Sequence, residues 1–429
     1  MNQTIYPIGI QNFEKIRKDG YLYIDKTALV YQLVTTGQYY FLSRPRRFGK
    51  SLLLSTLEAY FQGKKELFEG LAMEKLEKDW KEYPILHFDL NISQYDSPDS
   101  LYKILNDILS RYEDEYGTRP SEVTLPLRFA GIIDRAYRKT GQRAVILIDE
   151  YDKPLLQNLH DEEMQNRFRN MLKPFYGVLK TMDRAIRFAL LTGVTKFGKV
   201  SVFSDLNNLD DISMREPYAA ICGITETELR THFDEDIHTL ASALERTYEE
   251  ARSLLRKRYD GYHFGNTDIY CPWDVIRYCK SLCADPTAKP QDFWSNSSGN
   301  ALVRSFIDKA DVQTKDEIER LIAGEYIEKE ISQELTYDEI DKSIANLWSV
   351  LFTTGYLTKQ GVTDDGKVRL SIPNREIKNL FIKKIREWFS DTTANDGKTL
   401  EQFCNAFVEK DTEKIEQLFG DYLWNTISI

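Results

Sequence analysis

The sequence predicts an α/β protein in which a parallel sheet is flanked by helices. Two segments about a hundred residues apart carry most of this prediction. The first, residues 41–51 (FLSRPRRFGKS), ends an apolar strand in a loop, and the second, residues 145–150 (VILIDE), is a buried strand that ends in two carboxylates. In this order they are typical of the phosphate loop and the metal-binding strand of a P-loop NTPase.

The loop that ends in Gly49, Lys50 and Ser51 fits most of the pattern G-x-x-x-x-G-K-[ST]. A helix predicted over 51–61 begins where the helix of a phosphate loop must begin. Arg44 stands where the pattern has its first glycine, and a side chain there makes the usual tight turn costly. Two interpretations stay open: a modified loop that still directs backbone N–H groups at a β-phosphate, or an arginine-rich loop without that function.

The apolar run 145–148 predicts a central strand that is buried on both faces. Asp149 and Glu150 follow it at the carboxyl edge of the sheet, where open α/β sheets bind ligands. The structural alternative is a helix N-cap pair in the next turn, which Asp152 and Pro154 would suit. Because both segments occur in one chain, we expect nucleotide binding.

Two further apolar runs, residues 84–90 and 187–193, predict neighbouring strands. The second ends in Thr192, and in ATPases of this layout a polar side chain there lies near the γ-phosphate and helps to position the attacking water. A threonine that is bonded only to backbone is an equally open interpretation. The order of strand, phosphate loop, helix, strand, helices, acidic strand, helix and strand is typical of a parallel sheet wrapped by helices.

After this sheet the pattern becomes helical and then mixed. Residues 224–258 predict charged helices that open with a capping box of Thr225 and Glu228. Residues 259–273 hold a dense aromatic cluster, which favours packing at a domain junction over a base-stacking platform. Residues 321–389 predict helix, helix, hairpin and helix, as in a winged helix. DNA contact, closure on the sheet and partner binding all stay open for this module.

One acidic arrangement imitates a nuclease. Asp365 followed by Glu376 and Lys378 resembles the D…E-x-K ligands of metal-dependent nucleases. Pro373 interrupts the strand that this chemistry requires, and Asn374 is placed to cap the helix that carries Glu376. A glutamate that faces the helix dipole explains the pattern more simply.

Composition restricts the class of protein. A chain of 429 residues is longer than one core usually supports, so we expect two or three domains. A net charge of −10 argues against nucleic-acid binding over the whole surface. The five cysteines include no C-x-x-C pair, which favours reduced thiols. No signal peptide or membrane-length apolar run is visible, so we expect a soluble cytoplasmic protein.

The chain resembles the bacterial predicted AAA-ATPase family over most of its length. The matching segments are YPIGI (6–10), YLYIDKT (21–27), SRPRRFGKS (43–51), IDEYD (148–152), FSDLNNL (203–209), YDGYHF (259–264) and IPNRE (372–376). In this family an arginine at the position of Arg44 is a normal feature of the phosphate loop. Many relatives continue into a PD-(D/E)xK nuclease-like domain, and we expect this chain to stop before it.

The resemblance implies a P-loop sheet, a helical lid and a winged-helix-like module. We expect an ATPase core over 1–215, a helical lid subdomain over 216–290, a winged-helix-like domain over 291–390 and a helical tail over 391–429. No substrate is implied, because members of the family are largely uncharacterised.

For the chemistry we expect ATP hydrolysis by in-line attack of water, with ATP and Mg²⁺ as cofactors. Lys50 would hold the β- and γ-phosphate oxygens, while Ser51 and Asp149 would bind Mg²⁺. Glu150 would act as general base and Thr192 would orient the water. Arg46 and Arg47 are candidates to stabilise the charge of the transition state, although phosphate binding or a salt bridge to a neighbouring helix would explain their position in the loop as well. The nucleotide would be held by Arg46, Phe48, Gly49, Lys50, Ser51 and Leu52.

Other functions stay open. One is a nucleotide-gated signalling or scaffold protein with little turnover, which needs different affinities in its two states. Another is a small-molecule P-loop kinase, which the pair Asp149 and Glu150 fits less well than an ATPase. A third is a DNA-binding module with a degenerate nucleotide site, or a DNA-associated module coupled to a nuclease domain, whose binding would weaken steeply with salt.

Overall fold

The computed structural model describes residues 4–158, 161–195, 208–294, 301–332, 343–395 and 411–426, with isolated positions between 402 and 409. Its centre is a five-stranded sheet in the order β2-β3-β4-β1-β5, and all of its pairs are parallel. The strands are β1 (Tyr39–Ser43), β2 (Ile85–Asp89), β3 (Ala144–Asp149), β4 (Ile186–Gly193) and β5 (Asp210–Asp211). Every residue of β1 and β3 is buried, as expected for strands with helices on both faces.

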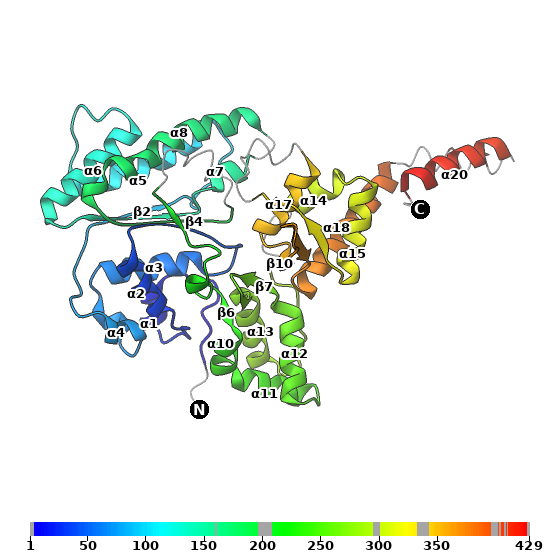
Figure 1. Cartoon of the computed structure of the whole chain (residues 1–429), viewed down its shortest axis with the longest axis horizontal. Coiled ribbons are helices and arrows are strands. Elements are labelled where there is room, and N and C mark those ends of the chain that lie inside the picture. The colour runs from blue at the N-terminus through cyan, green and yellow to red at the C-terminus, as the bar shows by residue number, and fades with distance from the viewer. Residues whose placement is uncertain are drawn as a thin grey trace.

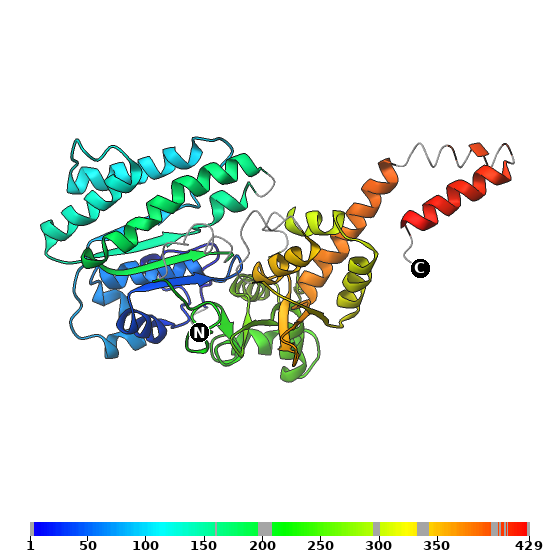
Figure 2. The same cartoon turned by 45° about the horizontal axis from the view of Figure 1, so that its top comes forward.

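Helices cover both faces of this sheet (Figures 1 and 2). One face carries α5 (Ser100–Tyr116), α6 (Leu125–Thr140) and α8 (Glu162–Thr181). The other carries α1 (Phe13–Lys18), α2 (Thr27–Thr36), α3 (Lys50–Phe61) and α4 (Ala72–Leu76). The shorter elements of this unit are α7 (Lys153–Leu156) and the 3₁₀ turns η1 (Lys65–Phe68), η2 (Asp183–Ala185) and η3 (Glu216–Tyr218). The predicted parallel sheet wrapped by helices is therefore confirmed.

A second unit, which we call the lid, follows the sheet. It contains α10 (Glu226–His232), α11 (Asp234–Ala243), α12 (Tyr248–Tyr259) and α13 (Pro272–Ala284). A small antiparallel sheet in the order β6-β8-β7 joins β6 (Ile224–Thr225), β7 (Tyr262–Phe264) and β8 (Thr267–Tyr270). The predicted capping box is present, because the side chains of Thr225 and Glu228 each accept the other's backbone N–H. The lid helices bury an apolar cluster of their own, which Tyr6 joins from the N-terminal segment.

A third unit, the C-terminal module, contains α14 (Ala301–Asp308), α15 (Val312–Ala323), β9 (Ile327–Lys329), α17 (Ile344–Thr353), β10 (Thr358–Val362), β11 (Val368–Ser371) and α18 (Arg375–Asn395). The predicted hairpin is β10–β11, and β9 pairs with its second strand in a sheet ordered β10-β11-β9. The buried apolar cluster of the main sheet continues into this module. Beyond it, α20 (Thr412–Thr426) lies at the end of the molecule farthest from the main sheet (Figure 1).

Within the described part of the chain, no helix is both long enough and apolar enough to cross a membrane. The proposed domain limits at 215, 290 and 390 stay predictions, whereas the grouping of elements into three units is visible in Figure 1.

Candidate functional site: the phosphate loop and the acidic strand end

The candidate site lies at the carboxyl edge of the main sheet. The loop 44–49 connects the end of β1 to the start of α3, and Gly49, with φ 96°, occupies the N-cap of that helix. Strands β3 and β4 are parallel to β1, so Asp149, the last residue of β3, and Thr192, the last but one of β4, reach the same edge. Three segments that are distant in sequence therefore meet here, as the alternation of strands and helices predicted.

Asp149 is the centre of a compact oxygen cluster. Its Oδ2 accepts a hydrogen bond of 2.5 Å from Ser51 Oγ, across 98 positions of sequence. Its Oδ1 accepts a hydrogen bond of 2.6 Å from Thr192 Oγ1 and another of 3.0 Å from the N–H of Glu150. Asp149 is 4% exposed and Thr192 is fully buried. A hydroxyl and a carboxylate side by side are the hard oxygen donors that Mg²⁺ prefers.

Lys50 and Glu150 form an ion pair beside this cluster. The Nζ of Lys50 lies 3.2 Å from Oε1 of Glu150, and it also donates to the carbonyls of Arg44 (3.2 Å) and Pro45 (3.4 Å). Lys50 is only 4% exposed, and the side chain of Glu150 is 18% exposed. Glu150 has φ 53°, an uncommon value for a residue other than glycine, which a site residue can hold only if its surroundings fix it.

The backbone of the loop presents unpaired donors. In the part of the chain that the structure describes, the N–H groups of Arg47 and Gly49 donate to no protein acceptor. They precede the N-terminus of α3, where N–H groups and the helix dipole both attract anions. The loop therefore has the donors that a phosphate cradle requires.

Arg44 does not disturb this cradle, because its side chain turns away into the protein. The guanidinium, 1% exposed, donates to the carbonyls of Ser43 (3.0 Å), Ser213, Tyr218 (3.3 Å) and Ala219 (3.4 Å). Burial lowers the pKa of Arg44 to about 10. The unusual backbone angle that the sequence suggested for this position occurs instead at Arg47, with φ 71°. The Arg44 side chain thus links the end of β1 by hydrogen bonds to residues 213–219, which lead into the lid.

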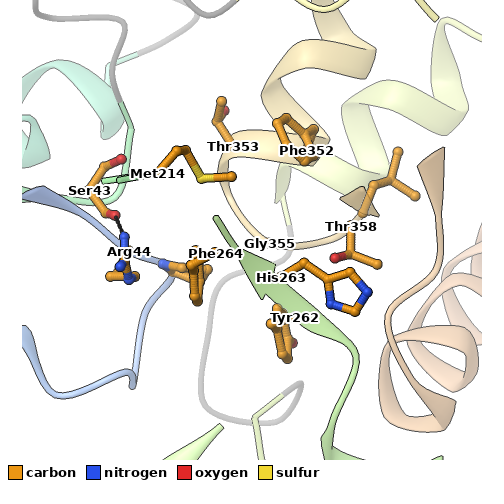
Figure 3. Close-up of a pocket in the computed structure, with 12 residues that line it drawn as sticks. Ser43, Arg44, Met214, Tyr262, His263, Phe264, Phe352, Thr353, Gly355 and Thr358 are labelled. Atoms are coloured by element: carbon orange, nitrogen blue, oxygen red, sulfur yellow. Dashed lines mark hydrogen bonds between the residues drawn. The ribbon is translucent and has the colours of Figure 1, made fainter. Parts of the chain in front are cut away.

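The lid and the C-terminal module enclose the start of the loop (Figure 3). The guanidinium of Arg44 lies 3.9 Å from the ring centroid of Phe264 in the lid hairpin. The ring of Phe48, 1% exposed, packs edge-on against Tyr262 and Phe264, with centroids 4.9 and 5.6 Å away. A cavity of about 40 Å³ lies among Arg44, the hairpin and the turn after α17. The aromatic cluster therefore packs at a junction, as predicted.

The two arginines between Pro45 and Phe48 are exposed. Arg47 stacks its guanidinium over the ring of Trp273, 4.3 Å from the centroid. No carboxylate partner of Arg47 is found in the described residues, so the salt bridge that the sequence left open is not seen. Its role at a transition state stays a prediction.

A second cavity adjoins the loop on the side of the N-terminal segment. It measures about 100 Å³ and includes Gly49 and Leu52 from the loop and α3. The other residues that line it are mostly apolar and come from the N-terminal segment and the lid: Pro7, Leu22, Tyr23, Ile24, Lys26, Cys222, Gly223, Ile224, Pro272 and Ile276, among others. The sequence motifs at 6–10 and 21–27 marked this region, but no function could be assigned to them from sequence alone.

Asp152 is a further residue of the site whose position the sequence did not reveal. It occupies the N-cap position of α7, as the sequence allowed, but its side chain makes no capping hydrogen bond there. It accepts instead from the N–H of Val194 (3.1 Å) and from the N–H and Oγ1 of Thr195 (both 2.7 Å), just after β4. Burial, with Glu150 nearby, raises the pKa of Asp152 to about 6. It fixes the acidic loop to the neighbouring strand.

The nuclease-like residues are not assembled. Asp365 lies in an exposed hairpin turn, where it accepts from Thr363 (2.5 Å) and pairs with Lys367 (2.8 Å). Asn374 caps α18 as predicted, since its Oδ1 accepts from the N–H of Ile377. Glu376 lies in the first turn of α18, as predicted, but it is only 1% exposed and lies close to the buried carboxyl of Asp274 in the lid.

The chain is similar to a known protein family, to a curated protein and to a solved structure. Residues 7–203 match the family described as predicted AAA-ATPase. An uncharacterized protein from the vnfD 5′ region of Azotobacter chroococcum mcd 1 is 34% identical over 383 residues, which cover 88% of this chain and 69% of that protein. The solved ORC2 protein of Aeropyrum pernix, in ADPNP–ADP complexes, aligns with 90% of this chain and 97% of its own at 11% identity and a TM-score of 0.30. By its sequence relationships, the chain belongs to the predicted AAA-ATPase family.

Proposed function

We propose that the protein is a Mg²⁺-dependent ATPase whose nucleotide binds between the phosphate loop and the acidic end of β3. The hydrogen bond between Ser51 and Asp149 carries this proposal, because it joins the two motifs at one point. Lys50 and Glu150 lie directly beside it, 3.2 Å apart. A lysine, a hydroxyl and two carboxylates at a helix N-terminus are the set that P-loop phosphoryl transfer uses.

Ser51 and Asp149 would hold the metal. When bound, Mg²⁺ would neutralise charge on the phosphate oxygens. Thr192 would contribute indirectly, because its hydroxyl donates to Asp149 and so fixes the orientation of that carboxylate. This geometry supports a positioning role for Thr192 beside the water-orienting role expected from the sequence.

Lys50 and Glu150 would separate when a nucleotide binds. Phosphate oxygens compete for the Lys50 ammonium, which now contacts Glu150 and two loop carbonyls. Glu150 would then be free to accept a proton from the attacking water. The exposed side chain of Arg46 and the stacked guanidinium of Arg47 could supply positive charge near the phosphates.

The cavity beside Gly49 and Leu52 would hold the nucleoside. It lies next to the phosphate loop, and its lining is mostly apolar, as an aromatic base requires. Its walls come from the N-terminal segment, from α3 and from the lid, so a bound nucleoside would touch all three. This placement supports a lid whose position depends on the nucleotide.

Nucleotide binding can be tested through stability. A ligand at 100 times its Kd raises the free energy of unfolding by about 2.7 kcal/mol. We expect ATP with Mg²⁺ to stabilise the wild type in urea denaturation and to have no effect on Lys50→Met. Lys153→Met is a matched control, because Lys153 lies near the acidic loop but donates to the carbonyl of Asn91. Equal stabilisation of Lys50→Met, or none of the wild type, would contradict the proposal.

A nucleotide-gated switch with slow turnover is the second candidate. The contacts of Arg44 and Phe48 with the lid hairpin favour it, since a loop held in this way could pass a change of state to the other modules. Tight binding of ATP without phosphate release would select this function.

DNA contact by the C-terminal module is not favoured. Its elements suit a winged-helix-like domain within the proposed limits 291–390, with α17 as the helix before the hairpin. However, α17 carries no lysine or arginine. Two cations of the hairpin are already paired, Lys367 with Asp365 and Arg369 with Glu328. A role in closing on the sheet module or in binding a protein partner fits these charges better.

A further inference from the structure

We propose that Trp294, which leads into the C-terminal module, is a positioning residue for the phosphate loop. This inference rests on the proposed function, because it assumes that the loop binds phosphates. It adds that the loop is completed by a residue 248 positions away in sequence. The C-terminal half would then be required for phosphate binding, and not only for a response to it.

The contact itself is specific. The indole Nε1–H of Trp294 donates to the carbonyl of Arg46 at 3.0 Å. Trp294 is 2% exposed, and its ring packs edge-on against Tyr356, with centroids 5.3 Å apart. Asp274, buried at the start of α13, lies close to the backbone of Trp294. The indole ring is therefore packed against the C-terminal module while its N–H reaches the loop.

The direction of this hydrogen bond determines what the loop can bind. The peptide unit between Arg46 and Arg47 is planar and trans, so its C=O and N–H point in opposite directions. The indole holds the C=O on its own side, and the N–H of Arg47 is thereby turned away from it. That N–H has no acceptor among the described residues. A donor that is fixed and unpaired in this way suits a phosphate oxygen.

The same peptide unit leads into the strained residue of the loop. Arg47 has φ 71°, which is unfavourable for a residue with a side chain. Two aromatic rings hold it there: Trp273 lies under its guanidinium, and Trp294 binds the carbonyl before it. Most phosphate loops keep such angles with glycine, whereas this loop uses indoles from outside the sheet module.

The test is Trp294→Phe, which keeps an aromatic ring against Tyr356 but removes the N–H donor. In the proposed binding mode ADP would contact the loop through its β-phosphate, a group that AMP lacks. Loss of one hydrogen bond corresponds to about a fivefold loss of affinity. We expect the affinity for ADP and ATP to fall by about this factor, with the affinity for AMP unchanged. Trp348→Phe is the control: it makes the same change at a buried indole that packs on Phe306 in the C-terminal module.

Each outcome has a distinct meaning. If the wild type binds no adenine nucleotide, the proposed function is wrong. If the wild type binds and Trp294→Phe retains the wild-type affinity for ADP, the inference about Trp294 is wrong. If ADP, ATP and AMP weaken equally, Trp294 is only structural and the inference also fails. Should Trp294→Phe not fold, Tyr356→Leu removes the ring that orients the indole. This variant must weaken the binding of ADP more than the binding of AMP, and an equal loss of affinity for both would overturn the inference.

Discussion

The close approach of Gly355 to the phosphate loop gives a prediction that the structure quantifies. Gly355 follows α17 in the C-terminal module and has φ +89°. A Cβ built on it would lie 2.6 Å from Cγ and 2.8 Å from Cβ of Pro45. Gly355→Ala must therefore either adopt a strained backbone against a proline ring or displace the loop that Pro45 belongs to.

Two energetic costs determine how much stability Gly355→Ala loses. An alanine with a left-handed backbone costs about 1–2 kcal/mol, and overpacking against a buried ring costs about 1–3 kcal/mol. Gly355→Ala should thus lower the free energy of unfolding by about 2–5 kcal/mol. Gly324→Ala isolates the first term, because Gly324 has φ +98° and no atom within 4 Å of its built Cβ.

The assay is urea denaturation of both variants, followed by titration with ATP. We expect Gly355→Ala to be less stable than Gly324→Ala by about 1–3 kcal/mol and to bind ATP more weakly. Gly324→Ala should bind ATP like the wild type. If the free energy of unfolding falls equally in the two variants, Gly355 does not pack closely against Pro45. The contact between the C-terminal module and the phosphate loop would then be refuted.

Three further predictions concern the site and the lid. Thr192→Val removes the donor to Asp149 and should cost about 1 kcal/mol of stability, with slower phosphate release; unchanged release would show that Thr192 positions nothing. Ser51→Ala should abolish the gain in ATP affinity that Mg²⁺ provides, and isothermal titration with and without Mg²⁺ checks this. Burial raises the pKa of Asp260 from 3.8 to about 6, so the folded state prefers the protonated carboxyl. Stability that is complete below pH 4 should then fall by about 3 kcal/mol as the pH rises past 6. Denaturation across pH 4–7 should show that the stability of Asp260→Asn rises relative to that of the wild type, and parallel curves would contradict this.

Much of the main sheet could be predicted because its strands are buried on both faces. Such strands appear as continuous apolar runs, as in β3, where all six residues are buried. The same logic placed Asp149 and Thr192 at one edge, since parallel strands end on the same side. By contrast β5 has two residues, too few to show any periodicity.

The site was predicted only as far as local patterns reach. The motif that ends in Gly49, Lys50 and Ser51 located the loop, but the position of the Arg44 side chain depends on carbonyls that only the fold brings around it. Glu376 lies at the start of a helix as predicted, but its burial beside Asp274 of the lid could not be predicted, because a single sequence does not show which elements pack together.

Long-range contacts account for the remaining differences. Nothing near Trp294 in the sequence indicates that its indole reaches Arg46. Asp152 looked like a helix cap, and its actual partners lie more than 40 positions away, at 194 and 195. Tertiary packing decided these positions, and a single sequence contains no signal for it.

The most direct test of the central claim is phosphate release from ATP with Mg²⁺, measured for the wild type and for Glu150→Gln, together with ATP binding by both. Glu150→Gln keeps the size of the side chain but cannot accept the proton of the attacking water. The account predicts that the wild type hydrolyses ATP. It also predicts that the variant binds ATP at least as tightly as the wild type and releases phosphate at least about 10²-fold more slowly. Failure of the wild type to bind ATP, or equal turnover by Glu150→Gln, would contradict it.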